Sequence, residues 1–210
     1  MSLPNQGHLV LISGPAGSGK STLAEIVLQR EAGKVRRAVT ATTRAPRPGE
    51  VDGVDYYFLT YDQFIEDLRA NRFVEYKHFN GNFYGCPTDS LSQALQRPGI
   101  TLLVIEVDGA ESIRFFYPNA SYIYIISPSP ASLRERLSGR GTESEEQIEG
   151  RLTIAKQEMK RLAEYDFLIV NSDLETAVTD LQNTLMVISR SIIVGGEAEA
   201  WENGAYEDWK

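Results

Sequence analysis

The sequence contains a single cysteine, Cys86, so no disulfide bond can form within the chain. One free thiol suits a reducing compartment, and we expect the protein in the cytoplasm. Long apolar runs are missing too, since no stretch approaches the roughly 20 residues that a membrane-spanning helix needs. The first residues have neither the positive charge nor the apolar stretch of a secretory signal. We therefore expect no membrane partner.

An excess of positive charge is also absent, because 21 Lys and Arg residues face 29 Asp and Glu residues, for a formal net charge of −8. Nucleic acid would repel such a chain, so we expect no nucleic acid partner. An anionic small molecule would need positive charge that is local. Two groups of arginines can form such patches: Arg36, Arg37, Arg44 and Arg47 in one, and Arg134, Arg136 and Arg140 in the other.

A chain of 210 residues can form one domain with a substantial core. Apolar segments with little polar alternation predict buried parallel strands at 9–12, 101–107, 122–126 and 167–170. Helical segments alternate with them, and the one at 174–190 carries an apolar side made of Ala177, Val178, Leu181, Leu185, Val187 and Ile188; another spans 109–117. This alternation predicts an α/β doubly wound fold with a mainly parallel sheet flanked by helices.

Two segments interrupt this core, which we place at about 1–35, 97–128 and 166–195 of a single domain. The first segment, about 36–96, is rich in turns and aromatic residues, which indicates short antiparallel strands. A helix is expected within it at 61–71, because Thr60 and Gln63 have capping-box spacing at its start. We expect a mixed α/β insertion here.

The second segment, about 129–165, opens with a Pro-Ser-Pro turn and continues as a long charged helix. Thr142 and Glu145 have capping-box spacing at the expected helix start. An apolar stripe at helical spacing is expected to pack, and consists of Ile148, Leu152, Ala155, Met159 and Leu162. The acidic tail, 196–210, is left with two alternatives: disorder, or docking through its aromatic side chains.

The sequence Gly-Pro-Ala-Gly-Ser-Gly-Lys-Ser-Thr at 14–22 follows a predicted strand and precedes a helical segment. This is the context of a phosphate-binding P-loop, in which backbone N–H groups and a helix N-terminus attract an anion. Lys20 can reach the β- and γ-phosphates, and the Ser21 hydroxyl can ligate Mg²⁺. The residues expected to bind the nucleotide are Gly14, Pro15, Ala16, Gly17, Ser18, Gly19, Lys20, Ser21 and Thr22.

A P-loop core with two insertions indicates a nucleotide kinase, in which one insertion binds the acceptor and the other closes as a helical lid. Closure would exclude water, which otherwise competes as phosphoryl acceptor.

Five separated blocks of sequence resemble guanylate kinases, and together the resemblance covers about residues 8–190. The blocks are the P-loop, Thr-Thr-Arg-Ala-Pro-Arg-Pro-Gly-Glu at 42–50 with Asp-Tyr at 55–56, Gly-Asn-Phe-Tyr-Gly at 81–85, Gly-Arg-Gly-Thr-Glu at 139–143, and Val-Asn at 170–171. The resemblance implies a P-loop kinase core with a five-stranded, mainly parallel sheet. It also implies transfer of a phosphoryl group from ATP to GMP, with Mg²⁺, giving ADP and GDP. It leaves open whether the protein is a monomer or a homodimer.

The resemblance also implies a role for individual residues in the acceptor site. Arg44, Arg47, Tyr56 and Tyr84 match the residues that hold the GMP phosphate, and planar guanidinium forks suit its oxygens. Glu75 matches the residue that reads guanine, whose N1–H and N2–H₂ donors a carboxylate can accept together. Thr40 and Cys86 match positions near guanine O6, and Glu106 matches one near the guanine amino group. Gly85 is also expected to bind the substrate.

The resemblance implies further residues around the transferring phosphoryl group. Arg136, Arg140 and Arg151 match lid arginines that reach this group when the lid closes, and Lys20 completes the set of catalytic cations. Asn171 matches a residue near the adenine of ATP.

Two positions depart from the family pattern. Cys86 stands where the family usually has a hydroxyl residue, and a thiol is a weaker donor to guanine O6. By the resemblance, Val104 replaces an acid that helps to orient water around Mg²⁺. Two alternatives follow: Glu106, which would point to the same face by strand alternation, substitutes for that acid, or the metal site is weakened and turnover is slow. Two other functions stay open: a degenerate guanylate kinase-like binding module, or a kinase for IMP or dGMP.

Overall fold

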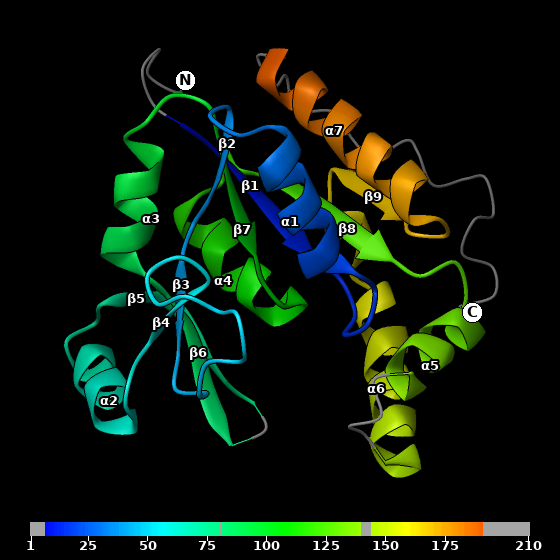
Figure 1. Cartoon of the computed structure of the whole chain (residues 1–210), viewed down its shortest axis with the longest axis horizontal. Helices are drawn as coiled ribbons and strands as arrows, with labels where there is room; N and C mark the ends of the chain where they lie inside the picture. The colour runs from blue at the N-terminus through cyan, green and yellow to red at the C-terminus, as the bar shows by residue number, and fades with distance from the viewer. Residues whose placement is uncertain (1–6, 80, 140–143, 191–210) are drawn as a thin grey trace. The chain divides into compact units, whose positions relative to one another are not determined.

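The computed structural model describes residues 7–79, 81–139 and 144–190 (Figure 1). The acidic tail, Arg140 and Thr142 therefore lie outside the described residues. Contacts divide the chain into two compact units. The insertion unit comprises residues up to 9, 33–103 and 108–120, and the P-loop unit comprises 10–32, 104–107 and the residues from 121 onward. Among the described helices, none combines the length and apolar character that crossing a bilayer requires.

A five-stranded sheet has the strand order β2-β7-β1-β8-β9. Its strands are β1 (His8–Ser13), β2 (Val35–Arg37), β7 (Ile100–Val104), β8 (Ser121–Ile126) and β9 (Phe167–Val170). β1 pairs with β8, β2 with β7, and β8 with β9, all in parallel. Every residue of β8 is buried, as expected for a parallel strand covered on both faces. The predicted α/β fold with a five-stranded parallel sheet is confirmed.

One predicted strand is too long. The segment 101–107 was expected to be a continuous strand, but β7 ends at Val104 and the helix α4 (Val107–Phe116) begins three residues later. Asp108 in the first turn of α4 favours a helix start here, because its charge faces the positive end of the helix dipole. The expectation that Glu106 shares a strand face with Val104 is therefore wrong, since Glu106 lies beyond the strand and is exposed.

The helices of the P-loop unit are α1 (Lys20–Arg30), α5 (Pro130–Ser138), α6 (Glu145–Met159), the short 3₁₀ helix η1 (Leu162–Glu164) and α7 (Leu174–Arg190). α7 has the predicted bounds, and the predicted apolar side is buried except for Val187, which is 54% exposed. Val187 precedes the buried Ile188 by one residue, a rotation of about 100° around the helix, so it turns toward solvent. Figure 1 shows α7 running beside α1.

The start of α6 differs from its prediction. Ser144 is the N-cap, and its hydroxyl and the side chain of Gln147 form the capping box. The predicted box between Thr142 and Glu145 is wrong, because Glu145 is already the first residue of the helix. The predicted Pro-Ser-Pro turn also contains the start of α5. Ser129 is the N-cap, and Pro130 is the first residue of the helix, where a missing N–H group costs nothing.

The insertion unit contains a second, four-stranded sheet with the order β4-β3-β6-β5. Its strands are β3 (Thr40–Thr42), β4 (Tyr56–Phe58), β5 (Phe73–Phe79) and β6 (Asn82–Pro87). β6 pairs antiparallel with β3 and with β5, as predicted. β3 and β4 pair in parallel, contrary to the prediction, because the connection 43–55 is long enough for the chain to return in the same direction.

Helices α2 (Tyr61–Arg69) and α3 (Thr88–Leu95) complete the insertion unit together with α4. α2 begins with the predicted capping box of Thr60 and Gln63. It ends two residues earlier than expected, because Asn71 adopts a positive φ of 52° that terminates the helix. Phe64 of α2 stacks on Phe73 at 4.3 Å and on Phe83 at 5.1 Å between ring centroids. This aromatic stack forms the core between α2 and the four-stranded sheet.

Candidate functional site

The glycine-rich loop 14–19 lies between β1 and α1, so its predicted strand–loop–helix context is confirmed. A Cβ atom on Gly14 would lie 2.0 Å from the carbonyl oxygen of Ile125, and one on Gly19 would lie 2.3 Å from Nδ2 of Asn171. Both glycines have positive φ angles, 139° and 97°, which other residues adopt only with strain. The loop therefore follows a path that needs glycine at these two positions.

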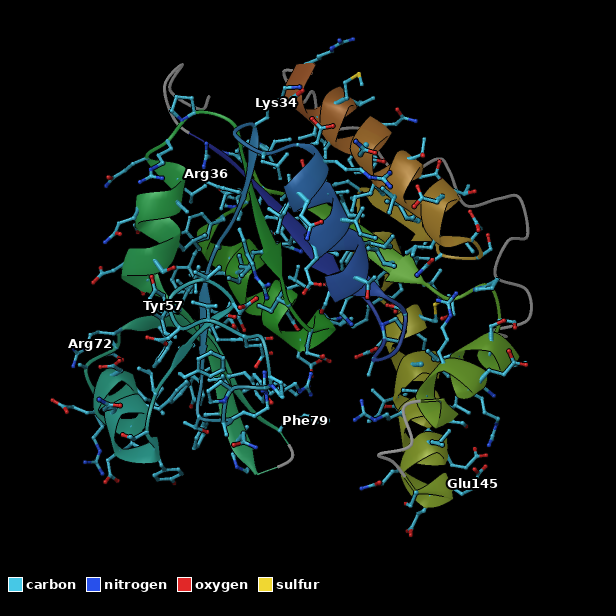
Figure 2. The ribbon with its side chains drawn as sticks, in the orientation of Figure 1. Lys34, Arg36, Tyr57, Arg72, Phe79 and Glu145 are labelled. Atoms are coloured by element: carbon cyan, nitrogen blue, oxygen red, sulfur yellow. The ribbon has the colours of Figure 1, made fainter. Side chains whose placement is uncertain are left out.

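The helix α1 begins without a capping side chain. Its N-cap, Gly19, makes no side-chain hydrogen bond, and its first turn has no acidic residue. By contrast, α6 begins with a capping box and has Glu145 and Glu146 in its first turn (Figure 2 labels Glu145). The first N–H groups of a helix carry partial positive charge and need acceptors. The start of α1 is thus suited to an anionic ligand.

Lys20, the first residue of α1, is only 9% exposed. Its ammonium group donates to the carbonyl oxygens of Gly14 at 2.5 Å and Pro15 at 2.9 Å. The Ser18 hydroxyl is fully buried and has no hydrogen-bond partner among the described residues. A buried ammonium group, a buried hydroxyl and an uncapped helix start together provide donors for phosphate oxygens.

A metal ion at this loop would depend on few protein ligands. Ser21 and Thr22 follow Lys20 and are exposed. Within the described ranges, no group of three or more His, Cys, Asp or Glu residues is placed to hold a metal ion. Mg²⁺ usually retains waters and is held by few protein groups together with substrate phosphates. The hydroxyl of Ser21 beside a phosphate site fits this mode of binding.

Two predicted residues contact the loop directly. Asn171, which follows β9 and is 4% exposed, donates from Nδ2 to the Ser18 carbonyl oxygen at 2.8 Å. Arg136 of α5 donates from Nη2 to the Asn171 carbonyl oxygen at 2.7 Å, and from Nη1 to the Ser18 carbonyl oxygen at 3.4 Å. The structure thus brings Asn171 and Arg136 to the P-loop. Arg151 lies half-buried on α6.

One member of each predicted arginine group is engaged by neighbouring protein groups. Arg134 pairs with Glu145 and Glu149 on α6, so its charge is neutralised. Arg36 (labelled in Figure 2) donates to the carbonyl oxygens of Arg97 and Pro98. Both arginines therefore stabilise their own surroundings, and local positive charge has to come from other members of the groups.

In the insertion unit, Arg44 is held by a carboxylate. Its Nη1 and Nη2 atoms donate to the two carboxylate oxygens of Glu50 at 3.0 and 2.8 Å, and Glu50 also accepts from the backbone N–H of Arg47 at 2.6 Å. The hydrogen bond from Arg44 is the main cause that lowers the pKa of Glu50, and the same bond raises the pKa of Arg44. Glu50 was not among the predicted site residues, although its position after both arginines is a signal for such a pair.

Aromatic rings lie beside this pair. The Arg44 guanidinium carbon is 5.5 Å from the ring centroid of Tyr56, and the Arg37 guanidinium carbon is also 5.5 Å from it. The rings of Tyr56 and Tyr84 meet edge to face at 6.4 Å. The structure thus brings Arg44, Tyr56 and Tyr84 together, with the exposed Arg47 three residues further along the chain.

Strand register places most of the predicted acceptor residues on one face of the four-stranded sheet. Thr40 pairs with Tyr56, and Glu75 pairs with Cys86. Tyr84 lies two residues before Cys86 on β6, so both side chains point to the same face. Tyr84 in turn pairs with Thr42, which shares a face with Thr40. Thr40, Tyr56, Glu75, Tyr84 and Cys86 therefore lie on one face of the sheet, although they are far apart in the sequence.

Gly85 lies on the opposite face, against the aromatic stack. A Cβ atom there would be 2.9 Å from Phe73 and 3.1 Å from Phe64. Close packing against these two rings therefore explains why glycine occupies this position. Cys86 is fully buried, and burial raises the pKa of its thiol well above the ordinary value, with a smaller contribution from Glu75. The thiol therefore stays protonated and enclosed.

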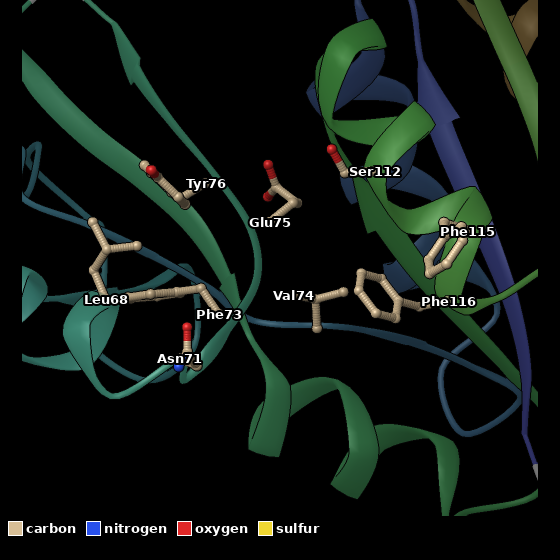
Figure 3. Close-up of a pocket in the computed structure, with 9 residues that line it drawn as sticks. All are labelled: Leu68, Asn71, Phe73, Val74, Glu75, Tyr76, Ser112, Phe115 and Phe116. Carbon is tan, nitrogen blue, oxygen red and sulfur yellow. The ribbon is translucent and has the colours of Figure 1, made fainter.

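A cavity of about 430 Å³ in the insertion unit lies at β5 and the end of α4 (Figure 3). Figure 3 shows Glu75 and Ser112 on its polar side, with Val74 and Phe116 facing each other below them. Among the described residues that were predicted to contact a base, Glu75 alone lines this cavity; Thr40, Cys86 and Glu106 do not. Phe115 is 83% exposed, so one wall is open to solvent.

Comparison with known proteins gives one consistent family. A family model described as guanylate kinase matches residues 6–187. The guanylate kinase of Desulfitobacterium hafniense (strain Y51) is 40% identical over 182 residues, covering 87% of this chain and 90% of the relative. That of Trichormus variabilis (strain ATCC 29413 / PCC 7937) is 42% identical over 182 residues, with 87% and 91% covered. A crystal structure of guanylate kinase from Anaplasma phagocytophilum superimposes with a TM-score of 0.71 at 30% identity, covering 90% of each chain.

Proposed function

The chain belongs to the guanylate kinase family, and we propose that it transfers the γ-phosphoryl group of ATP to GMP, giving ADP and GDP. The observation that carries the proposal is the intact P-loop, with Lys20 buried against it and α1 left without a cap. A binding module that had lost catalysis would have no need for this donor set. We place the reaction in the cytoplasm, where the free Cys86 remains reduced.

On the donor side, the P-loop residues and the ammonium group of Lys20 bind the phosphates of ATP. Lys20 exchanges its two loop carbonyls for phosphate oxygens, which are stronger acceptors because they are charged. Mg²⁺ bound through Ser21 would neutralise charge that develops on the phosphates. Arg136, Arg140 and Arg151 then supply positive charge to the transferring group, and cations in such positions stabilise the transition state strongly.

On the acceptor side, Arg44, Arg47, Tyr56 and Tyr84 bind the phosphate of GMP. The pair between Arg44 and Glu50 orients the guanidinium group before the nucleotide arrives, so less entropy is lost on binding. No strong general base is needed, because the attacking phosphate oxygen is already largely ionised near neutral pH. Catalysis then consists of positioning and charge neutralisation.

The guanine base is read by Glu75, with Thr40 and Cys86 on the same face of the four-stranded sheet. Adenine lacks the donor pair that a carboxylate can accept, so AMP would leave Glu75 unpaired. A site built on such hydrogen bonds rejects the wrong base by factors of up to about 10⁴–10⁵. Val104, half-buried at the end of β7, has no group that could orient metal-bound water, so we expect reduced Mg²⁺ affinity.

The test measures ADP formation from ATP and Mg²⁺ by the full chain, with GMP, dGMP, IMP, AMP, UMP and CMP as separate acceptors. We expect turnover with GMP well above that with AMP, UMP or CMP. Faster turnover with IMP or dGMP would instead identify a related purine kinase. No turnover with any acceptor, by protein with a cooperative unfolding transition, would contradict the proposed reaction and favour a binding module.

A further inference from the structure

Arg37, the last residue of β2, belongs to the first arginine group but has no part in the site described so far. Its backbone is fixed by pairing with Leu102 of β7, and the N–H of the next residue donates to the Leu102 carbonyl oxygen at 2.8 Å. The side chain is half-buried, and its guanidinium carbon lies over the ring of Tyr56, 5.5 Å from the centroid. Within the insertion unit, Arg37 thus reaches from the end of β2 to a residue of β4.

The ring of Tyr56 depends on side-chain contacts for its position. Tyr56 begins β4, a strand of three residues at the edge of the four-stranded sheet, so backbone pairing constrains it little. The Arg37 and Arg44 guanidinium carbons each lie 5.5 Å from the ring centroid. The rings of Phe58 and Tyr84 lie at 5.8 and 6.4 Å between centroids. These four side chains therefore decide where the Tyr56 hydroxyl lies.

The two arginines beside the ring differ in how their charge is balanced. Both oxygens of the Glu50 carboxylate accept from Arg44. Arg37 has no carboxylate partner among the residues that the structure describes. Its positive charge is therefore not neutralised by a neighbouring anion, and such a cation is attracted to the negative face of an aromatic ring. The contact with Tyr56 is the interaction that this half-buried charge makes.

We propose that Arg37 is a positioning residue of the acceptor site, which holds the Tyr56 ring by a cation–π contact and so directs the Tyr56 hydroxyl to the acceptor phosphate. The inference rests on the proposed function, in which Tyr56 binds the phosphate of GMP. Arg37 then acts through one of the phosphate-binding residues and makes no contact with the nucleotide itself. Its effect on GMP binding should disappear when the Tyr56 hydroxyl is removed.

A double-mutant cycle tests this dependence. Calorimetry measures the dissociation constant of GMP for the unmodified full chain, Arg37→Gln, Tyr56→Phe and the variant with both changes. Glutamine removes the positive charge and keeps a planar polar group, while phenylalanine keeps the ring and removes the hydroxyl.

We expect Arg37→Gln to weaken GMP by about 3- to 10-fold, the range that a partly buried cation–π contact can supply. Tyr56→Phe should weaken GMP by about tenfold, the scale of a lost hydrogen bond to a charged group. In the Tyr56→Phe chain, Arg37→Gln should change the constant by less than about twofold, because no hydroxyl remains to be positioned. Arg69→Gln removes an exposed arginine of α2 and should leave the constant unchanged.

Equal factors for Arg37→Gln with and without the Tyr56 hydroxyl would mean that Arg37 acts on GMP independently of Tyr56, and the inference would be wrong. An unchanged constant in Tyr56→Phe would also overturn it, since the hydroxyl would then not bind the phosphate. A role limited to folding would lower the urea midpoint of Arg37→Gln and leave its constant for GMP unaltered, which is a third contrary result.

Failure of the proposed function has a different signature. The unmodified chain would then bind no GMP and form no ADP with it, whereas each contrary result above requires an unmodified chain that binds GMP. The two failures are therefore distinguishable.

Discussion

The two units build their sites in different ways. In the P-loop unit, nine consecutive residues from Gly14 to Thr22 form the site, and much of its geometry belongs to the backbone. In the insertion unit, the candidate acceptor residues come from four strands and the loop that follows β3, and their side chains form the surface. One site is determined by local sequence and the other by strand register.

This difference decides how each site tolerates change. A backbone site depends on loop conformation, so substitution of most of its side chains leaves the N–H groups in place. The acceptor site of the insertion unit, which strand pairing brings together, depends on each side chain and on the partner that orients it, as Glu50 orients Arg44. We therefore expect that substitution of one side chain in the P-loop unit reduces activity very strongly. In the insertion unit, we expect several substitutions to have effects of graded size.

Lys20→Ala tests the P-loop side and carries the largest expected effect. Lys20 is the side chain of the loop that brings full positive charge to the donor phosphates, so turnover should fall by at least about 10²–10³-fold. Because the Lys20 ammonium group donates to carbonyl oxygens of the loop itself, those of Gly14 and Pro15, we expect the fold to persist without it. Steady-state ADP formation measures the loss, and circular dichroism checks the fold.

Lys160→Ala is the matched control, since Lys160 is exposed at the end of α6. It removes the same charge and should retain full turnover. If Lys20→Ala keeps more than a tenth of the activity of this control, backbone groups alone bind the phosphates and the side chain has no special role.

The same contrast explains what the sequence could predict. The P-loop was predictable residue by residue, because its residues are consecutive and its strand and helix flank it directly. The parallel sheet and α7 were predictable because their apolar patterns are long and unambiguous. The capping box of α2 was also predictable, since both of its residues are local.

Features that depend on register or on competing local signals were missed. The parallel pairing of β3 with β4 is not encoded in either short strand, and the start of α6 was assigned to Thr142 although Ser144 offers an equally good cap. The partnership of Glu50 with Arg44 depends on how the loop folds back. The acceptor residues themselves were predicted from family resemblance, because nothing local shows that they share one face.

Glu75→Gln tests the insertion unit and has the second largest expected effect. An amide offers one acceptor oxygen to the two donors of guanine and brings a donor of its own. The KM for GMP should rise by on the order of tenfold, and the preference for GMP over AMP should fall by on the order of 10²-fold. Steady-state kinetics with both acceptors measures the change, and kcat with GMP should change less than KM.

Glu66→Gln makes the same substitution at an exposed position of α2 and should leave both constants unchanged. An unaltered KM for GMP in Glu75→Gln, with GMP still preferred, would remove Glu75 from base recognition. The cavity that it lines would then belong to another ligand.

Glu50→Gln carries the smallest expected effect and tests whether orientation of Arg44 matters. The amide cannot accept both guanidinium N–H groups, so the KM for GMP should rise by about 3- to 10-fold with kcat nearly unchanged. Its pH dependence gives a second measurement. The folded pKa of Glu50 lies below the ordinary value of 4.5, so its stabilising contribution is complete above that value and is lost as the pH falls through the folded pKa.

Urea unfolding of the unmodified chain and Glu50→Gln should therefore differ by a constant free energy near neutral pH. The difference should shrink toward zero below pH 4.5, because protonated Glu50 no longer pairs with Arg44, whose raised pKa keeps it charged throughout. Glu66 has no such partner in α2, so Glu66→Gln should have the same free energy of unfolding as the unmodified chain at every pH. A difference that persists unchanged in acid would show that Glu50 acts through packing, and the graded effects expected of the insertion unit would need another cause.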